Sequence, residues 1–327
     1  MDSNLSLILK ALLAIALGSG GVVAIFYGLN ILVEKTFSHS RQEKILPWVY
    51  VGPALLLLAA YLVLPTLQTI YLSFFNHNST QFVGLKNYLF AFTSSDMLIA
   101  FRNNILWLVL VTGISVGLGL IFAVLVDRVR YESLAKSLIF LPMAISFVGA
   151  SVVWRFMYAY RPIGTEQIGL LNAVTVFLGF EPVAWLLEKD FNNFALIAIM
   201  IWLQTGFCMV LLSSAVKGVP KDLIEAARID GANEFQIFRR IIIPMITPTL
   251  MVVATTVVVL VLKVFDIVFV MTGGNLDTDV IASRMIKEMF NFRNFGRGSA
   301  IAVILLIAII PVIVANIKRF QQQESNR

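Results

Sequence analysis

The sequence predicts an all-α protein with seven membrane-spanning helices, and three observations lead to this prediction. The 327 residues are 59% hydrophobic and only 13% charged, with a mean hydropathy of +0.87, values typical of polytopic membrane proteins. The apolar residues are collected in runs of about 20 or more, the length that crosses the hydrocarbon core as a helix. The basic residues gather in alternate connections between these runs, as the positive-inside rule describes.

Seven apolar runs are long enough to cross a bilayer. They are residues 7–33, 47–75, 104–126, 137–159, 193–216, 242–271 and 298–317. The first run is too long for a signal peptide and lacks a convincing cleavage site, so we expect a retained helix. Residues 170–180 are apolar but too short to span. We expect them to form an interfacial helix or a cap over one face of the bundle.

The connections between these runs differ in basic charge, which predicts the orientation of the chain. One set of connections holds 14 Lys and Arg residues in total, in segments 34–46, 127–136 and 217–241 and at the C-terminus. The alternate connections are longer and hold 9. Basic residues are retained on the cytoplasmic side, so we expect the N-terminus outside and the C-terminus inside. The three long outer loops either dock an external partner or only cap the bundle.

The same sequence argues against several classes of site. Cys208 is the only cysteine, so neither an intramolecular disulfide nor a cysteine-based metal cage can form. The two histidines, His39 and His77, fall on opposite sides of the predicted membrane, and we predict no catalytic residue and no metal site. The basic residues that orient the spans explain the pI near 9.5, so no nucleic-acid partner is expected.

The connection after the fifth run is predicted to form two short helices at an angle. Pro220 can occupy a first helical turn, where no backbone donor is needed, and Glu225 follows in the early turns, where negative charge suits the helix dipole. Gly231 permits the left-handed conformation that ends helices. Asn233, with Gln236 three residues later, forms a variant of the capping box and begins the second helix.

The first of these helices is suited to contact with another protein. Ala226 and Ala227 are small, so another backbone can approach them closely. An ordinary amphipathic interfacial helix is the alternative, but the apolar face here is narrow and both signs of charge are present. A groove in a partner protein is therefore the better match.

The spacing of these residues resembles the EAA loop of ABC-importer permeases. The triplet EAA at 225–227 is followed at the motif's spacing by Gly231 and by a segment ending at Pro244, with Ile243 where leucine is usual. In that family the loop is a coupling helix that sits in a cleft of a cytoplasmic ATPase. The resemblance implies that Glu225 makes the main polar contact and that Gly231 supplies the turn. The implied coupling residues are Glu225, Ala226, Ala227, Arg228, Asp230, Gly231 and Ala232.

The resemblance extends over roughly residues 47–317. The string EAARIDGAN is similar to carbohydrate-importer permeases of the maltose and α-glucoside type, and YLSFFN, FVGLKNY, FDIVFVMTGGN and NFGRGSAIAV look like the same group. Segments 146–162 and 167–173 most resemble α-glucoside or glucosylglycerol-type permeases. The resemblance implies the type I ABC-importer permease fold in the bacterial plasma (inner) membrane.

The implied partners and organisation follow from the same resemblance. The chain has no GxxxxGK[ST] motif, so we expect no cofactor on it and place ATP and Mg on the partner ATPase. The expected partners are an ABC ATPase dimer, a second and different permease chain, an external or periplasmic solute-binding protein, a carbohydrate substrate and membrane lipid. The expected parts are an N-terminal helix with its cytoplasmic connection (1–46), a permease core (47–317) containing the coupling loop (218–243), and a cytoplasmic tail (318–327).

Polar side chains inside the runs are candidates for a substrate pathway, because they are costly in a membrane. Lys263 and Asp266 are three residues apart, so on one helix they would share a face and could pair, although Lys263 could also snorkel to the outer interface. Gln204 lies mid-span and needs a partner, either another helix or a substrate. Resemblance to maltose-type permeases implies six pathway positions, which are Leu203, Gln204, Phe207, Thr256, Leu260 and Lys263. We add the neighbouring Asp266 as a seventh.

We therefore predict a permease subunit of an ATP-driven importer that works by alternating access and is not itself an enzyme. Its substrate is expected to be a sugar, glycoside or polyol, with disaccharides and α-glucosides favoured. One alternative is an ion-gradient-driven secondary transporter, which would need intramembrane carboxylate relays, and only Asp266 is available. The other is a non-transporting membrane scaffold, which leaves the EAA spacing unexplained.

Overall fold

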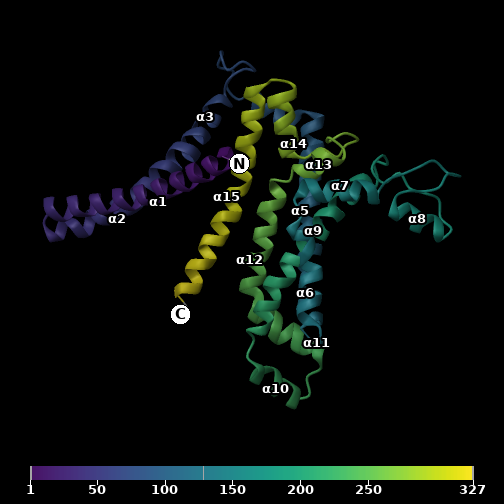
Figure 1. Ribbon diagram of the computed structural model, residues 1–327. Coiled ribbons are helices and arrows are strands. Elements are labelled where there is room, and N and C mark those ends of the chain that lie inside the picture. Colours follow the sequence, from purple (N-terminus) through teal and green to yellow (C-terminus); the bar gives the residue numbers. More distant parts are fainter. Residues whose placement is uncertain (1, 128, 326–327) are drawn as a thin grey trace. The chain divides into compact units, whose positions relative to one another are not determined.

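The computed structural model describes residues 2–127 and 129–325, and the helices in these ranges confirm the all-α prediction (Figure 1). Two basic residues counted above, Arg128 and Arg327, lie outside the described residues. The chain divides after Gln68 into two compact units. Each unit has its own packing, described separately below.

The N-terminal unit is a helical hairpin. Its helices are α1 (Asp2–Thr36), α2 (His39–Leu58), the π-helical turn η1 (Ala59–Val63) and α3 (Leu64–Leu72), whose last residues belong to the second unit. The ring of Phe26 stacks on that of Tyr50, with 5.8 Å between centroids. The Gln42 side-chain amide donates to the backbone carbonyls of Glu34 and Phe37 at 2.9 and 2.8 Å. These bonds satisfy acceptors that the end of α1 leaves free and so close the turn of the hairpin.

The second unit contains the remaining helices and an isolated β-bridge between Phe75 and Phe82. Its first helices are α4 (Lys86–Thr93), α5 (Ser95–Val126), α6 (Glu132–Phe140), the 3-10 turn η2 (Leu141–Ala144), α7 (Phe147–Met157), α8 (Leu170–Phe177) and α9 (Asn192–Lys217). The others are α10 (Lys221–Ile229), α11 (Glu234–Ile237), the π-helical η3 (Phe238–Ile242), α12 (Ile243–Leu262), α13 (Asp266–Met271), α14 (Ile281–Ile286), the π-helical η4 (Lys287–Asn291) and α15 (Phe295–Ser325). Figure 1 shows α10 at one end of this unit and α13 and α14 toward the other.

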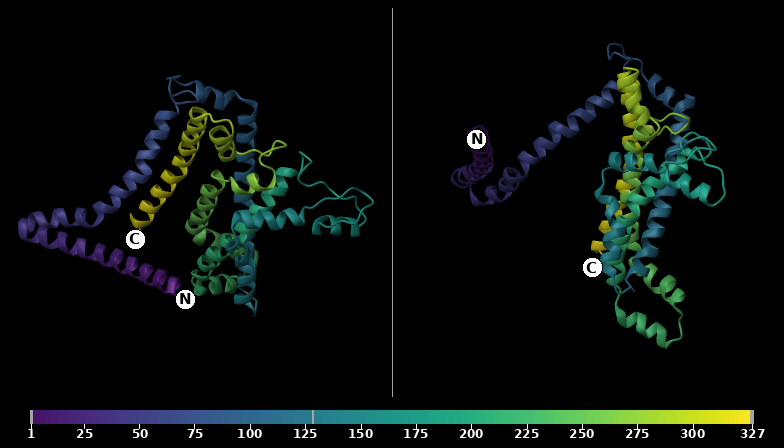
Figure 2. Two further views of the ribbon diagram at one scale, coloured as in Figure 1. Left: turned by 45° about the horizontal axis from the view of Figure 1, so that its top comes forward. Right: turned by 45° about the vertical axis from the view of Figure 1, so that its right-hand side comes forward.

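Helix α9 lies at the centre of the second unit, and α5, α6 and α12 pack against it (Figure 2). Of its most apolar stretch 67% is buried, against 28% for α5. Trp107, Met200 and Leu212 are among the fully buried large side chains of this core. The helices come closest where Gly119 of α5 faces α9, because a Cβ there would lie 2.9 Å from the Met209 backbone nitrogen. Side chains on α9 are therefore held by neighbours on several sides.

Among the described residues, six helices are long and apolar enough to cross a membrane, and a bent pair could supply a seventh. Helices α1, α5, α9 and α15 contain the predicted segments 7–33, 104–126, 193–216 and 298–317, and a continuous helix over His39–Leu72 contains most of 47–75. The short segment 170–180 contains α8. Residues 318–325 of the predicted tail continue α15.

The prediction of one continuous span over 137–159 is wrong. Helices α6 and α7 meet at 100°, with the break at Ile145 and Ser146. Ile145 is extended, with ψ 136°, and the Ser146 hydroxyl accepts a hydrogen bond from the Gly149 backbone N–H at 3.0 Å. Ser146 thus acts as an N-cap, which starts a new helix in a direction that the apolar pattern does not indicate.

The predicted span 242–271 is confirmed as far as Leu262, within the candidate span Glu234–Leu262, but its continuation to 271 as one helix is wrong. Helix α12 ends at Leu262, Lys263 caps it with φ −101° and ψ 12°, and α13 begins at Asp266. Lys263 and Asp266 therefore belong to different helices and do not share a helical face. The ion pairs of the described residues do not include one between them.

Candidate functional site

Helix α10 has the form predicted for the coupling loop. Pro220 is its N-cap and not, as expected, part of its first turn. Glu225 and Ala226 are exposed, whereas Ala227 is half-buried and packs with Ile224 against the core of the second unit. Of the two alanines, only Ala226 is thus open to another protein, and Ala227 seats α10 on its own chain.

The end of α10 is a complete Schellman motif. The backbone N–H of Ala232 donates to the carbonyl of Ala227 at 2.9 Å, and that of Gly231 donates to the carbonyl of Arg228 at 3.1 Å. Gly231 has φ +83°, a conformation that side chains other than hydrogen disfavour. The motif satisfies carbonyls that would otherwise lack partners at the helix end, which confirms the conformation predicted for Gly231.

Polar contacts then link α10 to the next helix. Arg228 Nε lies 2.9 Å from Glu234 Oε1. Its hydrogen bond to Glu234 and that residue's charge, aided by the more distant charge of Glu225, raise the pKa of the Arg228 guanidinium above its usual range. Asn233 and Gln236 form the predicted capping box, with both hydrogen bonds at 2.9 Å. The loop is thus closed by its own residues, and Arg228 is engaged within it.

The outer surface of this loop combines acidic and apolar side chains. Among the predicted coupling residues, those exposed are Glu225, Ala226, Arg228, Asp230 and Gly231. Beside them Leu223, Ile229 and Phe235 are 47%, 86% and 68% exposed. Large apolar side chains beside charged ones are typical of surfaces that bind other proteins.

Four of the seven predicted pathway residues line one cavity of about 430 Å³ in the second unit. The lining residues are Met143, Ile145, Ser146, Phe147, Val148, Leu203, Gln204, Leu260 and Asp266. The other three predicted residues are not among them. Phe207 packs against the core, while Thr256 and Lys263 are exposed elsewhere. The cavity is thus lined by residues from the middle of α9, the end of α12 and the two helix breaks.

The lining is mostly apolar, with a few polar atoms. Gln204 is only 3% exposed, and its Oε1 has no hydrogen-bond partner among the described residues. Asp266 is half-buried at the start of α13. Leaving a buried amide oxygen without a partner is costly. A bound molecule that donates a hydrogen bond to Gln204 Oε1 would remove this cost. The lining from Met143 to Val148 was missed by the sequence reasoning, although Ser146 as a helix-starting residue within an apolar run is a signal for the break.

At the end of the bundle away from α10, four asparagines hold the loop that follows α13. Asn103 of α5 donates to the carbonyls of Asp277 and Asp279 at 2.7 and 2.8 Å. On α9, Asn192 donates to the carbonyl of Leu276 at 2.8 Å and Asn193 to that of Asp277 at 3.2 Å. The fourth, Asn104 of α5, accepts from the N–H of Ile281 at 2.7 Å. This loop is therefore fixed to the ends of both central helices.

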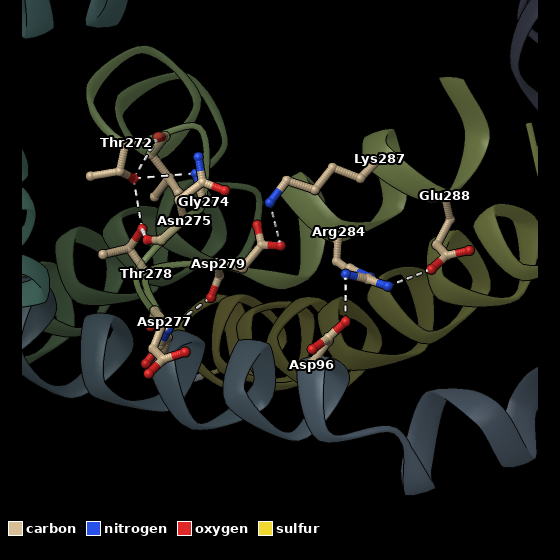
Figure 3. Close-up of polar contacts among 12 residues, drawn as sticks. Asp96, Thr272, Gly274, Asn275, Asp277, Thr278, Asp279, Arg284, Lys287 and Glu288 are labelled. Carbon is tan, nitrogen blue, oxygen red and sulfur yellow. Dashed lines mark hydrogen bonds and ion pairs between the residues drawn. The ribbon is translucent and has the colours of Figure 1, made fainter. Parts of the chain in front are cut away.

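Ion pairs hold this loop and the helical segment that follows it (Figure 3). Lys287 Nζ lies 2.8 Å from Asp279 Oδ2, and Arg284 lies 2.9 Å from Asp96 and 2.8 Å from Glu288. Because the loop begins where α13 ends, its attachment also positions α13 and, at the start of that helix, the cavity-lining Asp266.

A multi-span helical bundle with a mostly apolar cavity and a capped helix outside one end is the arrangement expected of a membrane permease. The chain belongs to the family of binding-protein-dependent transport system inner membrane components, which it matches over residues 95–324. It is therefore a multi-pass inner-membrane permease subunit of an ABC importer and not itself an enzyme. This membership replaces the alternatives of a secondary transporter and a scaffold.

Two relatives are similar along nearly all of their lengths. The chain is 74% identical over 279 residues to the osmoprotective compounds uptake permease protein GgtC of Synechocystis sp., covering 85% of this chain and 100% of the relative. It is 45% identical over 324 residues to the alpha-glucoside transport system permease protein AglF of Rhizobium meliloti, covering 95% and 96%. A crystal structure of a bacterial ABC transporter that imports the acidic polysaccharide alginate matches with a TM-score of 0.74 and 20% identity, over 86% of this chain and 96% of that chain. At that identity the match shows the fold, which is that of ABC importer permeases.

Proposed function

We propose that this permease imports a neutral sugar, glycoside or polyol, with α-glucosides and osmoprotective glycosides as the favoured class. The observation that carries the proposal is the cavity that gathers Leu203, Gln204, Leu260 and Asp266. Its volume of about 430 Å³ falls in the range of small-molecule sites. The names of the two relatives, an osmoprotectant permease and an α-glucoside permease, support the same class.

The chemistry of the cavity suits a hydroxylated ligand without net charge. The free oxygen of Gln204 and the Asp266 carboxylate accept hydrogen bonds from hydroxyl groups. Leu203, Leu260 and Phe147 offer apolar surface to the C–H faces of a sugar ring. The described lining contains no basic side chain, so it offers no counter-charge to an acidic sugar.

Transport is proposed to follow alternating access, with ATP and Mg bound by a separate ATPase dimer. The distribution of basic residues supports placing α10 in the cytoplasm and the N-terminus outside. There Glu225 and its exposed neighbours enter a cleft of the ATPase, so that closure of the motor displaces α10. A second, different permease chain and an external solute-binding protein complete the importer.

Competition for uptake tests the substrate class. A strain lacking this chain is complemented with it, and uptake of a labelled α-glucoside is measured with neutral glycosides, polyols, uronides and amino acids as competitors. We expect the neutral glycosides to compete and the uronides and amino acids not to. Preferential competition by a charged compound would contradict the proposal.

Two variants test whether the cavity is the pathway. Gln204→Leu keeps the size of the side chain but removes one hydrogen bond to the substrate worth about 1 kcal/mol, so we expect the uptake rate at low substrate concentration to fall about fivefold. Lys263 lies outside the cavity, so Lys263→Met should leave the rate within about twofold. Membrane levels of each variant are compared by immunoblot. Equal uptake by wild type and Gln204→Leu would remove the cavity from the pathway.

A further inference from the structure

An ionic cluster joins α6 to α5 and α9 at the end of the bundle nearest α10. The ammonium group of Lys136 on α6 lies 2.5 Å from Asp127 Oδ1 and 2.6 Å from Glu132 Oε1. It also donates to the hydroxyl of Ser213 on α9. Ser213 in turn donates to Asp127 Oδ1 at 2.7 Å. Lys136 thus joins its own helix α6 to the C-cap of α5 and to α9.

The cluster is shielded, and a second link runs beside it. The side chains of Lys136 and Asp127 are only 19% and 14% exposed, and Ser213 is buried. Glu132 at the start of α6 also pairs with Lys217, the last residue of α9. Shielded charge pairs with several hydrogen bonds hold their partners more firmly than exposed ones. The cluster therefore fixes the N-terminal half of α6 to the C-terminal end of α9.

The same end of α9 leads directly into α10. Lys217 is followed by Gly218, whose N–H bonds to the carbonyl of Ser214 at 3.2 Å, and by Val219, which is 5% exposed. Helix α10 then begins at Lys221. A link this short and this well packed passes a displacement of α10 to the end of α9.

The other end of α6 leads into the cavity wall. After Phe140 the chain forms η2 and reaches the break at Ile145 and Ser146, both of which line the cavity. Here too α6 lies tightly against α9, because a Cβ at Gly206 would be 2.7 Å from the Phe140 Cα. Helix α6 is thus attached to α9 near both of its ends.

We infer that Lys136 is a positioning residue for transport: it fastens α6 to α9 so that the cavity wall at Ile145 and Ser146 moves together with α10. The inference rests on the proposed coupling role of α10. Without the cluster, α6 is held to α9 by packing alone, tightest at Phe140, and its N-terminal end no longer follows α9 when the motor displaces α10. Access to the cavity then fails to alternate although ATP is hydrolysed. The expected defect is loss of coupling, which a residue needed only for folding would not produce.

The test uses the whole importer, purified with its ATPase, second permease and binding protein and reconstituted in liposomes. Lys136→Met should lower substrate imported per ATP about tenfold, the effect of losing charge-assisted hydrogen bonds, while ATPase activity stays within about twofold. Lys136→Arg keeps the charge and should restore most of the ratio. Lys189→Met breaks a more exposed lysine ion pair, at 2.6 Å to Asp277. Lys189 lies in the α8–α9 connection and not on α6, so this variant is the control for the loss of a lysine charge, with an unchanged ratio.

Further variants keep the result decisive. If Lys136→Met does not assemble, Ser213→Ala with Lys217→Met removes the links to α9 and keeps those to Asp127 and Glu132. This double variant should uncouple in the same way. An unchanged import-to-ATP ratio in an assembled variant, or a proportional loss of both activities, would overturn the role of Lys136. Glu225→Ala separates the two proposals. If this variant keeps normal uptake and stimulated ATPase activity, the coupling role of α10 is wrong. If Glu225→Ala is defective while Lys136→Met keeps a normal import-to-ATP ratio, only the role of Lys136 is wrong.

Discussion

Replacing Gly231 by alanine should loosen the end of α10 without any steric clash. A Cβ built at Gly231 meets no atom within 4 Å, so space is not the obstacle. The cost comes from the backbone, whose φ of +83° an L-residue adopts at a cost of about 1–2 kcal/mol. That cost shifts the equilibrium between the closed Schellman turn and an open loop about five- to thirtyfold. Gly231→Pro should be more severe, because proline cannot adopt this φ and lacks the N–H that bonds to Arg228.

The assay combines uptake in complemented cells with amide hydrogen exchange of the purified importer over residues 225–236. We expect faster exchange and slower uptake in Gly231→Ala, and abolished uptake with normal membrane insertion in Gly231→Pro. Gly179→Ala is the matched control, since Gly179 has φ +85° and also meets no atom within 4 Å but lies far from α10 in the α8–α9 connection. Normal uptake and exchange in both Gly231 variants, or an equal defect in Gly179→Ala, would refute the reasoning.

Three other substitutions test separate parts of the molecule. Glu225→Ala should abolish uptake while the chain inserts normally, because it removes the exposed carboxylate proposed to contact the ATPase; retained uptake and substrate-stimulated ATPase would exclude that contact. Gly274→Ala places a Cβ 2.6 Å from Lys287 Nζ at a φ of +70° and should destabilise the fixed loop after α13 by about 1–3 kcal/mol. This destabilisation is measured as a lower Tm in detergent, and an unchanged Tm would contradict it. Asn172 is buried and makes four hydrogen bonds, at 2.9 to 3.2 Å, within the loop around α8. Asn172→Ala leaves partly buried backbone groups of Ala159 and Val183 unpaired and should open this loop at a cost of about 1–3 kcal/mol. Limited proteolysis at 160–190 is the readout, and cleavage as slow as in wild type would argue against the role.

Features that depend on a short stretch of chain were predictable from the residues alone. Apolar runs of sufficient length identify most spans, because every residue in a run contributes to the same transfer free energy. The turn at Gly231 and the capping box of Asn233 and Gln236 involve partners within five positions along the chain. Such local hydrogen bonds are encoded by the order of a few residues, so the form of α10 was predictable in detail.

Features that depend on distant segments were decided by packing. The breaks at Ser146 and after Leu262 interrupt runs that are predominantly apolar and long enough to span. A hydropathy profile does not indicate the direction in which a helix leaves the bundle. The cavity takes residues from five separate helical segments, η2, α7, α9, α12 and α13, whereas the side chain of Phe207 is partly buried and packs against the core. Lys136 donates a hydrogen bond to Ser213, which is 77 positions away along the chain. Contacts of this range exist only once the helices have packed, because the positions that face one another are set by their rotation and crossing and not by any local pattern.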